Sequence, residues 1–226
     1  MSRTYPLRIR RLCSLLFRAE TFADIGCDHG YCAEYMLANG LCARATVTDI
    51  RPACLSKAER LLSPYVVSGA CVPLCTDGLR GVDRDTELVL IAGMGGMEIA
   101  QILREGFIPR NFVLQPMRDT REVRSLLLAG GAHISGDFMF SDGKNFYDVL
   151  TGSAAGGTDA YSADELSFGR DNVRSRGRDF LAWLDREIGK TDTYLSQPLG
   201  PDARAELERR KEYLERVRDG ENARTL

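Results

Sequence analysis

The sequence predicts an α/β fold, in which a mostly parallel sheet carries helices on both faces and is followed by a helical, coiled-coil-like arm. Two observations support this. From Phe22 to Thr151, short apolar runs typical of buried strands alternate with segments of helical periodicity. After Thr151, a stretch of small residues leads into charged sequence with apolar residues at helical intervals. We therefore predict two domains, residues 1–152 and 153–226.

The elements of the first domain follow one another regularly. An amphipathic helix, with leucines from Leu7 to Leu16, precedes the first strand. Two late strands, at 132–140 and 145–151, flank the Asp142-Gly143 pair, which is a hairpin signal and suggests an antiparallel end to the sheet. Between these limits we expect strands at 22–25, 43–49, 66–75, 87–92 and 111–116, and helices at 28–37, 55–62, 97–104 and 120–129.

The C-terminal segment is predicted to form two antiparallel helices. Apolar residues from Phe168 to Leu195 recur at helical spacing, two prolines interrupt them, and a second stripe runs from Leu207 to Val217. Arginines cluster early in this segment among many acidic residues. Both a solvated helical pair and an RNA-binding arm agree with that composition.

Composition and charge restrict the class of protein. Hydrophobic residues make up 44% of the 226 residues and charged residues 27%, as in ordinary globular proteins. The net charge of −2 excludes a protein coated in positive charge, although a local basic patch can still bind nucleic acid. No apolar run approaches the roughly 18 residues of a membrane span, and the N-terminus lacks the apolar core of a signal peptide. We expect a cytoplasmic protein with no membrane partner.

The cysteines do not suggest a metal site or disulfides. There are seven of them, an odd number, and none forms a C-x-x-C pair. Most lie in apolar runs, which is typical of reduced, buried thiols in a cytosolic protein. No metal site is expected.

The stretch from Phe22 to Tyr31 predicts a ligand site. Asp24, Gly26 and Gly30 have the spacing D-x-G-x-x-x-G at the end of the first strand. Gly26 has no Cβ, so the turn can be sharp and a ligand can lie against the backbone. The following helix directs its free N–H groups and the positive end of its dipole at the same place. Strand, turn and helix together predict a nucleotide-type site.

Polar or glycine residues also end the other predicted strands. Because ligands bind at the carboxyl ends of parallel strands, these residues are expected to meet at one edge of the sheet. They are Gly26, Asp49, Asp77, Gly93 and Gln115.

The residue types at this edge favour a cationic ligand. Dinucleotide enzymes usually carry G-x-G-x-x-G, but here Asp28 occupies the place of the middle glycine. An acidic residue ahead of the turn, Asp24, suits S-adenosylmethionine, which has an ammonium and a sulfonium but no phosphate. We expect Asp24 to face its amino end and Asp49 to accept hydrogen bonds from the ribose hydroxyls. Asp77 and Gly78 would then lie near the adenine.

These motifs together resemble the bacterial tRNA adenine-N1 methyltransferases that act on position 22. The resemblance spans roughly residues 7 to 151. The matching motifs within it are Ala23–Tyr31, Thr76–Leu79, Ile91–Gly96 and Leu114–Pro116. The resemblance implies a Rossmann-like class I methyltransferase domain, S-adenosylmethionine as methyl donor, S-adenosylhomocysteine as product and tRNA as partner. It also implies that the coiled-coil arm helps to hold tRNA.

The chain departs from the family pattern at four positions. The family usually has Ala, Leu and Pro where this chain has Gly30, Cys32 and Ala33, and Asn where it has Met117. These changes affect the fine shape of the acceptor pocket and leave the donor site intact.

The residue chemistry and the resemblance together assign the site residues. Donor binding is expected from Asp24, Gly26, Asp49, Ile50, Asp77, Gly78 and Gly93. Catalysis is expected from Asp28, His29 and Tyr31. Substrate binding is expected from Arg8, Arg11, Met94, Gly95, Gly96, Gln115 and Pro116.

Several of these assignments have a structural alternative. Asp28 is expected to stabilise the positive charge that grows on adenine, but an aspartate here also suits a helix N-cap. His29 suits a structural role as well as a catalytic one. The loop 93–96 lets a flat base approach, with Met94 as an apolar wall, or is simply a tight turn. Gln115 is expected to present its amide to a base edge, and the N-terminal arginines suit either RNA or solvent.

The predicted reaction is methyl transfer to N1 of an adenine, at position 22, in tRNA. N1 lies on the Watson–Crick edge, so the base must be unpaired or flipped out. One alternative is a methyltransferase for a small molecule or a protein. Another is a non-catalytic protein that binds S-adenosylmethionine. A nicotinamide dehydrogenase is disfavoured by the missing glycines.

Overall fold

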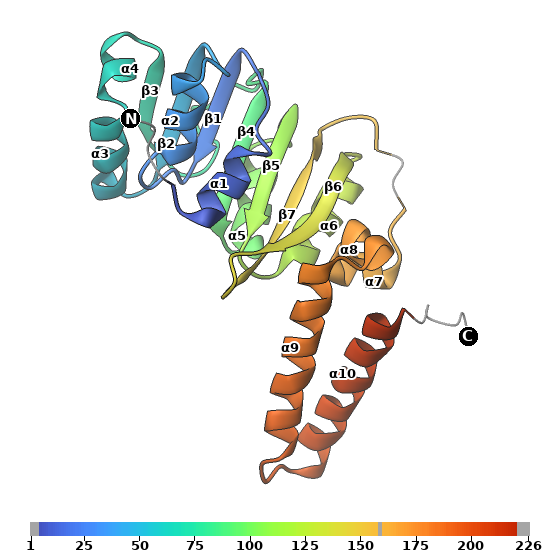
Figure 1. Ribbon diagram of the computed structural model, residues 1–226. Helices are drawn as coiled ribbons and strands as arrows, with labels where there is room; N and C mark the ends of the chain where they lie inside the picture. Colours follow the sequence, from blue (N-terminus) through green and yellow to red (C-terminus); the bar gives the residue numbers. More distant parts are fainter. Residues whose placement is uncertain (1–4, 158–159, 221–226) are drawn as a thin grey trace. The chain divides into compact units, whose positions relative to one another are not determined.

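The computed structural model describes residues 5–157 and 160–220 (Figure 1). The chain divides into two compact units. The first comprises the chain up to Asp137 together with Tyr147–Ala160. The second comprises Phe138–Phe146 and the chain from Tyr161 onward, so the tip of the last hairpin groups with the C-terminal helices. The domain boundary expected at residue 152 stays a prediction.

The first unit is built on one sheet, which confirms the predicted α/β fold. The strands of this sheet are β1 (Thr21–Ile25), β2 (Arg44–Asp49), β3 (Cys71–Cys75), β4 (Leu88–Met94), β5 (Asn111–Pro116), β6 (His133–Ser141) and β7 (Phe146–Ser153). The end of β6 from Phe138 and the start of β7 at Phe146 fall in the second unit. The strand order is β3-β2-β1-β4-β5-β7-β6. Strands β1 to β5 pair in parallel, and β7 is antiparallel to β5. The expected antiparallel end of the sheet is therefore present.

The strand order creates the place for a ligand. From β1 the chain moves outward to β2 and β3, and it then returns to β4 on the other side of β1. A reversal of this kind leaves a crevice at the carboxyl ends of the two central strands. Both strands are apolar and largely buried, as expected for strands covered on both faces. Gly26 follows β1 and Gly93 lies in β4, so both flank the crevice.

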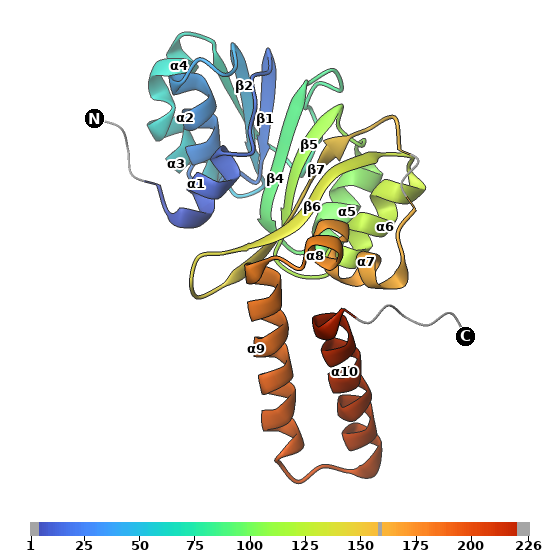
Figure 2. The same cartoon turned by 45° about the vertical axis from the view of Figure 1, so that its right-hand side comes forward.

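Helices cover both faces of this sheet. In Figure 2, α1 (Leu7–Cys13), α2 (Tyr31–Ala38), α3 (Pro52–Leu61) and α4 (Ser63–Val67) lie on one side, and α5 (Gly96–Glu105) and α6 (Thr120–Ala129) lie on the other. No helix within the described ranges combines the length and the apolar character that crossing a bilayer requires.

Two predicted boundaries in the first unit are wrong. The strand expected at 66–75 begins only at Cys71, because Pro64 at the start of α4 supports a short helix that continues to Val67. Helix α2 begins at Tyr31 and not at Asp28, because Asp28 and Gly30 both have left-handed backbone conformations, with φ of 44° and 71°.

The second unit contains α7 (Ala163–Phe168), α8 (Arg170–Ser175), α9 (Arg178–Leu195) and α10 (Pro201–Asp219). Helices α9 and α10 lie side by side as the predicted pair (Figure 1). The apolar stripe from Phe168 does not form one helix, because Gly169 and Arg176 interrupt it with φ of 95° and 51°. The core of this unit consists of Phe168, Phe180, Leu184, Ile188, Leu214 and Val217.

A buried ion pair ties α6 to the sheet within the first unit. The side chains of Arg124 and Asp137 are both fully buried. The Nε–H of Arg124 donates to both carboxylate oxygens of Asp137, at 3.0 and 2.9 Å, and its Nη2 lies 3.5 Å from Asp148. Burial of such a pair is costly unless the charges remain matched.

We predict that Arg124→Met destabilises the chain by about 3–5 kcal/mol, because it leaves the Asp137 carboxylate buried without its cation. Urea unfolding followed by circular dichroism measures this change. Arg121→Met, on the exposed face of the same helix, is the matched control and should change stability by less than about 0.5 kcal/mol. Equal effects of the two substitutions would contradict the prediction.

Candidate functional site

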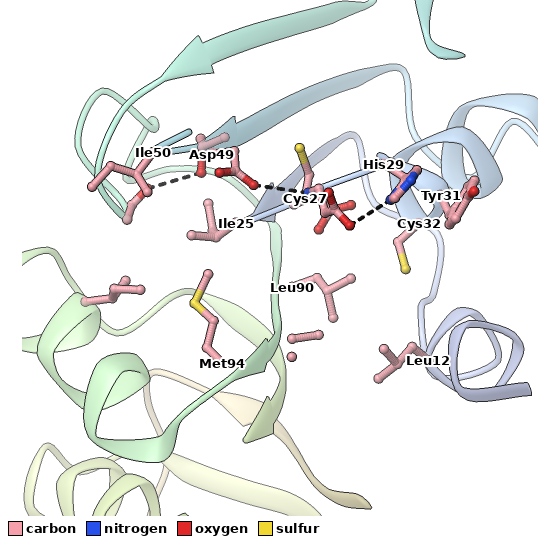
Figure 3. Close-up of a pocket in the computed structure, with 18 of the residues that line it drawn as sticks. Leu12, Ile25, Cys27, His29, Tyr31, Cys32, Asp49, Ile50, Leu90 and Met94 are labelled. Carbon is pink, nitrogen blue, oxygen red and sulfur yellow. Dashed lines mark hydrogen bonds and ion pairs between the residues drawn. The ribbon is translucent and has the colours of Figure 1, made fainter. Parts of the chain in front are cut away.

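A cavity of about 570 Å³ lies at the carboxyl ends of β1, β2 and β4, bordered by α1 and α5 (Figure 3). This volume is typical of a small-molecule site. The structure brings most of the predicted site residues to its walls: Arg8, Asp24, Gly26, Asp28, His29, Tyr31, Asp49, Ile50, Asp77, Gly78, Gly93 and Met94. Five predicted residues lie outside the lining: Arg11, Gly95, Gly96, Gln115 and Pro116.

The turn after β1 carries the site. Gly26 has a φ of 68°, and a Cβ at this position would collide with the terminal methyl of Met94. The left-handed conformation favours glycine here, and a side chain at this position would also displace the end of the Met94 side chain. The next residue, Cys27, donates its N–H to the carbonyl of Thr48 at 2.9 Å, which fastens the turn to the end of β2.

Asp49 at the end of β2 fits the predicted ribose contact. Its side chain is nearly buried, and its two oxygens accept N–H groups from Asp28 at 3.3 Å and Arg51 at 2.9 Å. A carboxylate offers about four lone-pair sites, so acceptor capacity remains for two hydroxyl groups. Beside it, Ile50 lines the cavity and is 63% exposed, so its apolar side chain is available to pack against a purine (Figure 3).

Asp24 is a buried carboxyl group in the wall of the cavity. Burial raises its pKa to about 7; the N–H of Ala33 opposes this shift, and the nearby charge of Asp49 adds to it. A cationic ligand group would supply the missing counter-charge. This environment fits the expected contact with the amino end of S-adenosylmethionine.

Asp28 is held in a strained backbone conformation, with φ of 44°. Its carboxylate lies 2.7 Å from His29 Nδ1 and 3.2 Å from Lys57 Nζ. Partial burial raises its pKa, but hydrogen bonds from Lys57, Cys54 and His29 outweigh that effect, so the pKa is lowered overall. Asp28 does not cap α2, because the N-cap is Gly30 and no side-chain cap bond is present. The capping alternative is therefore wrong.

His29 and Tyr31 form a small aromatic group beside Asp28. Their rings stack at 5.2 Å with an interplanar angle of 12°, and Tyr31 also contacts the ring of Tyr5 at 5.7 Å. Both His29 and Tyr31 line the cavity. Their catalytic role stays a prediction.

Gln115 has a different environment from the one expected. It is fully buried, and its Oε1 accepts a hydrogen bond from Arg8 Nη1 at 2.9 Å. Its Nε2 donates to the carbonyl of Pro116 at 3.1 Å and lies 3.3 Å from Met117 Sδ. The amide is thus engaged inside the protein and does not present its edge to the cavity.

The glycine loop after β4 serves packing as well as the cavity. Gly93 has a φ of 81° at an irregularity in the pairing of β4 with β5. A Cβ at Gly96 would collide with the backbone carbonyls of Arg118 and Asp119, which supports the tight-turn alternative for that residue. Met94 faces the cavity, as expected (Figure 3).

Several lining residues were not anticipated. Leu12 on α1 and Glu98 on α5 belong to the wall, with Cys27, Cys32, Thr48 and Ile102. Acidic residues are common in the first turn of a helix because they interact favourably with the helix dipole. The sequence therefore offers no reason to assign Glu98 to a ligand site. The pKa of the Cys27 thiol is raised by burial and by the charges of Asp24 and Asp49, so this cysteine is a poor nucleophile.

The raised pKa of Asp24 predicts a pH-dependent cost to stability. Between its unfolded pKa of 3.8 and about 7, the native chain holds a proton on Asp24 that the unfolded chain has lost. The free energy of unfolding therefore falls as the pH rises through this window. Asp24→Asn keeps the acceptor oxygen but removes the titration. We expect the variant to be more stable than wild type at pH 8, by roughly 2–4 kcal/mol, with a smaller gap at pH 5.

Denaturant unfolding at the two pH values measures this difference. Asp85→Asn, in the exposed loop before β4, is the control for a general change of charge. A stability gap for Asp24→Asn that is the same at both pH values would contradict the prediction.

Comparison with known proteins agrees with this geometry. A family model described as a methyltransferase domain matches residues 6–150. A putative tRNA methyltransferase of Mycoplasma pneumoniae is 31% identical over 147 residues, which are 63% of this chain and 68% of that protein. The tRNA (adenine(22)-N(1))-methyltransferase of Bacillus subtilis is 24% identical over 221 residues, covering 94% of this chain and 92% of that protein.

Solved structures share the fold. The structure of M. capricolum TrmK in complex with S-adenosyl-homocysteine is 19% identical and has a TM-score of 0.84, over 97% of this chain and 100% of that chain. The family model spans well over half of the sequence and contains the whole cavity wall. The chain belongs to the methyltransferase domain family.

Proposed function

We propose that this chain transfers the methyl group of S-adenosylmethionine to N1 of an adenine, at position 22, in tRNA, and that it does so in the cytoplasm. The M. pneumoniae relative is named as a putative tRNA methyltransferase. The B. subtilis relative is named for methylation of adenine 22 at N1, and it aligns over nearly the full length of both chains. The observation that carries the proposal is the cavity lined by Gly26, Asp28 and Asp49, where the strand order reverses between β1 and β4.

The donor would lie along this cavity. Asp49 would hold the ribose hydroxyls, and Ile50 and Gly78 would border the adenine. Asp24 would face the ammonium group. The carboxylates in the wall, which include Asp77 and Glu98, suit a ligand that carries a sulfonium and disfavour one that carries phosphates.

The reaction needs alignment more than proton transfer. Adenine N1 is a neutral nucleophile with a free lone pair, so it attacks the sulfonium methyl without prior deprotonation. Positive charge moves from the sulfonium to the base, and S-adenosylhomocysteine leaves as a neutral thioether. The protein therefore has to hold the two reactants in line and stabilise the charge that appears on the base.

Asp28 is the group proposed to stabilise that charge. Its lowered pKa keeps it ionised near neutral pH, and its contacts with Lys57 and His29 fix its position. A carboxylate with a lowered pKa is a weak base, so we assign it an electrostatic role and not that of proton acceptor in the chemical step.

The cysteines in the wall favour methylation at nitrogen. Methylation at a ring carbon of a pyrimidine needs a nucleophile, usually a thiolate, to activate the ring. Burial raises the pKa of Cys27, and a hydrogen bond with Cys13 together with burial raises that of Cys32. The raised pKa of each thiol disfavours the thiolate at neutral pH.

The test is methyl transfer from labelled S-adenosylmethionine to unmodified tRNA, followed by nucleoside analysis. We expect 1-methyladenosine with a tRNA that has adenine at position 22, and none when that base is guanine. Asp28→Asn should lower the turnover rate by roughly 100-fold or more while donor binding persists, because charge stabilisation at the base is lost. Asparagine tolerates the left-handed backbone that alanine would strain.

Asp119→Asn is the matched control, since Asp119 also has a left-handed backbone, with φ of 53°, and lies outside the cavity lining. It should retain full activity. Wild-type protein that binds the donor but methylates no tRNA would overturn the substrate assignment in favour of another methyl acceptor or a binding role. Loss of activity in both variants would overturn the role of Asp28.

A further inference from the structure

The two ends of the cavity differ in character. Figure 3 places Ile50 and Asp49 at one end and Leu12, Cys32 and Tyr31 at the other. The first end fits the nucleoside part of the donor, as described above. The second must then receive its amino-acid part, which carries an ammonium and a carboxylate. Asp24 can pair with the ammonium group of the donor, and the carboxylate of the donor requires a cation from the protein.

Arg8 is the cation at this second end. It lies on α1 one helical turn before Leu12, and both residues line the cavity. Asp24 and Cys32 belong to the wall of the same cavity as Arg8. Among the described residues, the other guanidinium in the wall belongs to Arg51, which lies 3.6 Å from Asp49 at the nucleoside end.

The Arg8 guanidinium is held in place by the protein through one of its nitrogens. Nη1 donates to Gln115 Oε1 at 2.9 Å and lies 3.9 Å from Met117 Sδ. Gln115 cannot turn its amide round, because its Nε2 is already committed to the carbonyl of Pro116. Gln115 is therefore a positioning residue for Arg8.

The remaining donors of Arg8 match a carboxylate. Within residues 5–157 and 160–220, no hydrogen bond or ion pair occupies its Nε–H or Nη2–H groups. These two groups form one edge of the planar guanidinium and can bind both oxygens of a carboxylate side by side. The guanidinium also lies over Gly93, where a Cβ would approach Nη1 to 2.9 Å, so the glycine keeps this place open.

We propose that Arg8, positioned by Gln115, binds the α-carboxylate of the methyl donor and not a phosphate of the RNA. This rests on the proposed function, since it assumes that the cavity binds S-adenosylmethionine. It assigns to donor binding a residue that the sequence suggested for RNA. It also explains why a buried glutamine at the end of β5 faces α1.

The test compares S-adenosylhomocysteine with its decarboxylated analogue, which keeps the amine but lacks the carboxylate, by titration calorimetry. Wild type should bind S-adenosylhomocysteine roughly 10- to 100-fold more tightly than the analogue, as expected for a charged hydrogen-bonded pair. Arg8→Gln should lose most of this preference while keeping its affinity for the analogue. Gln115→Leu, which removes the acceptor for Arg8 Nη1, should reduce the preference.

Arg10→Gln is the matched control, because Arg10 is exposed on the same helix. It should keep the full preference. An Arg8→Gln variant that retains the preference but shows a shallower salt dependence of tRNA binding would overturn the proposal and assign Arg8 to a phosphate. Wild type that binds neither compound would overturn the proposed function itself, and this inference with it.

Discussion

The left-handed turn between β1 and α2 is the constraint on which the site depends. Gly26, Asp28 and Gly30 have φ of 68°, 44° and 71°, so the chain reverses within five residues. This reversal brings the Asp28 N–H to the Asp49 carboxylate and directs the Asp28 side chain to Lys57 and His29. The non-glycine residue in the strained conformation is the one to which we assign charge stabilisation, which agrees with the tendency of backbone strain to occur at functional sites.

Charge is distributed along the cavity to suit a ligand with two cationic groups and one carboxylate. Buried or half-buried carboxylates face the interior, and the guanidinium of Arg8 lies at one end. The burial of Asp24 without a cation is unfavourable in the free protein, as its raised pKa indicates. The ammonium group of the donor would supply this cation and stabilise the ionised Asp24 carboxylate. Part of the binding energy would therefore come from pairing this buried carboxylate.

Much of this arrangement could be predicted from the sequence, and the reasons are local. Apolar runs ended by Gly26, Asp49 and Gly93 predict strands whose carboxyl ends meet, and they do. The contacts of Gln115 could not be predicted, because they depend on Arg8, which is distant in sequence. The break in the C-terminal helical stripe at Gly169 and the short helix α4 were not predicted for another reason. Apolar spacing does not reveal where single residues take left-handed or helical conformations.

Met117 stands where the family usually has Asn, and it contacts both Gln115 and Arg8. This departure from the family pattern therefore lies beside the end of the cavity that we assign to the amino-acid part of the donor.

The most direct test of this account is a crystal structure of the chain with S-adenosylhomocysteine. We predict that its ribose hydroxyls bind Asp49, that its adenine lies against Ile50 near Gly78, and that its amino-acid end lies between Asp24 and Arg8. The base site would then open beside Asp28 and Met94. A ligand bound in the reverse direction, or one whose carboxylate faces solvent away from Arg8, would contradict the account.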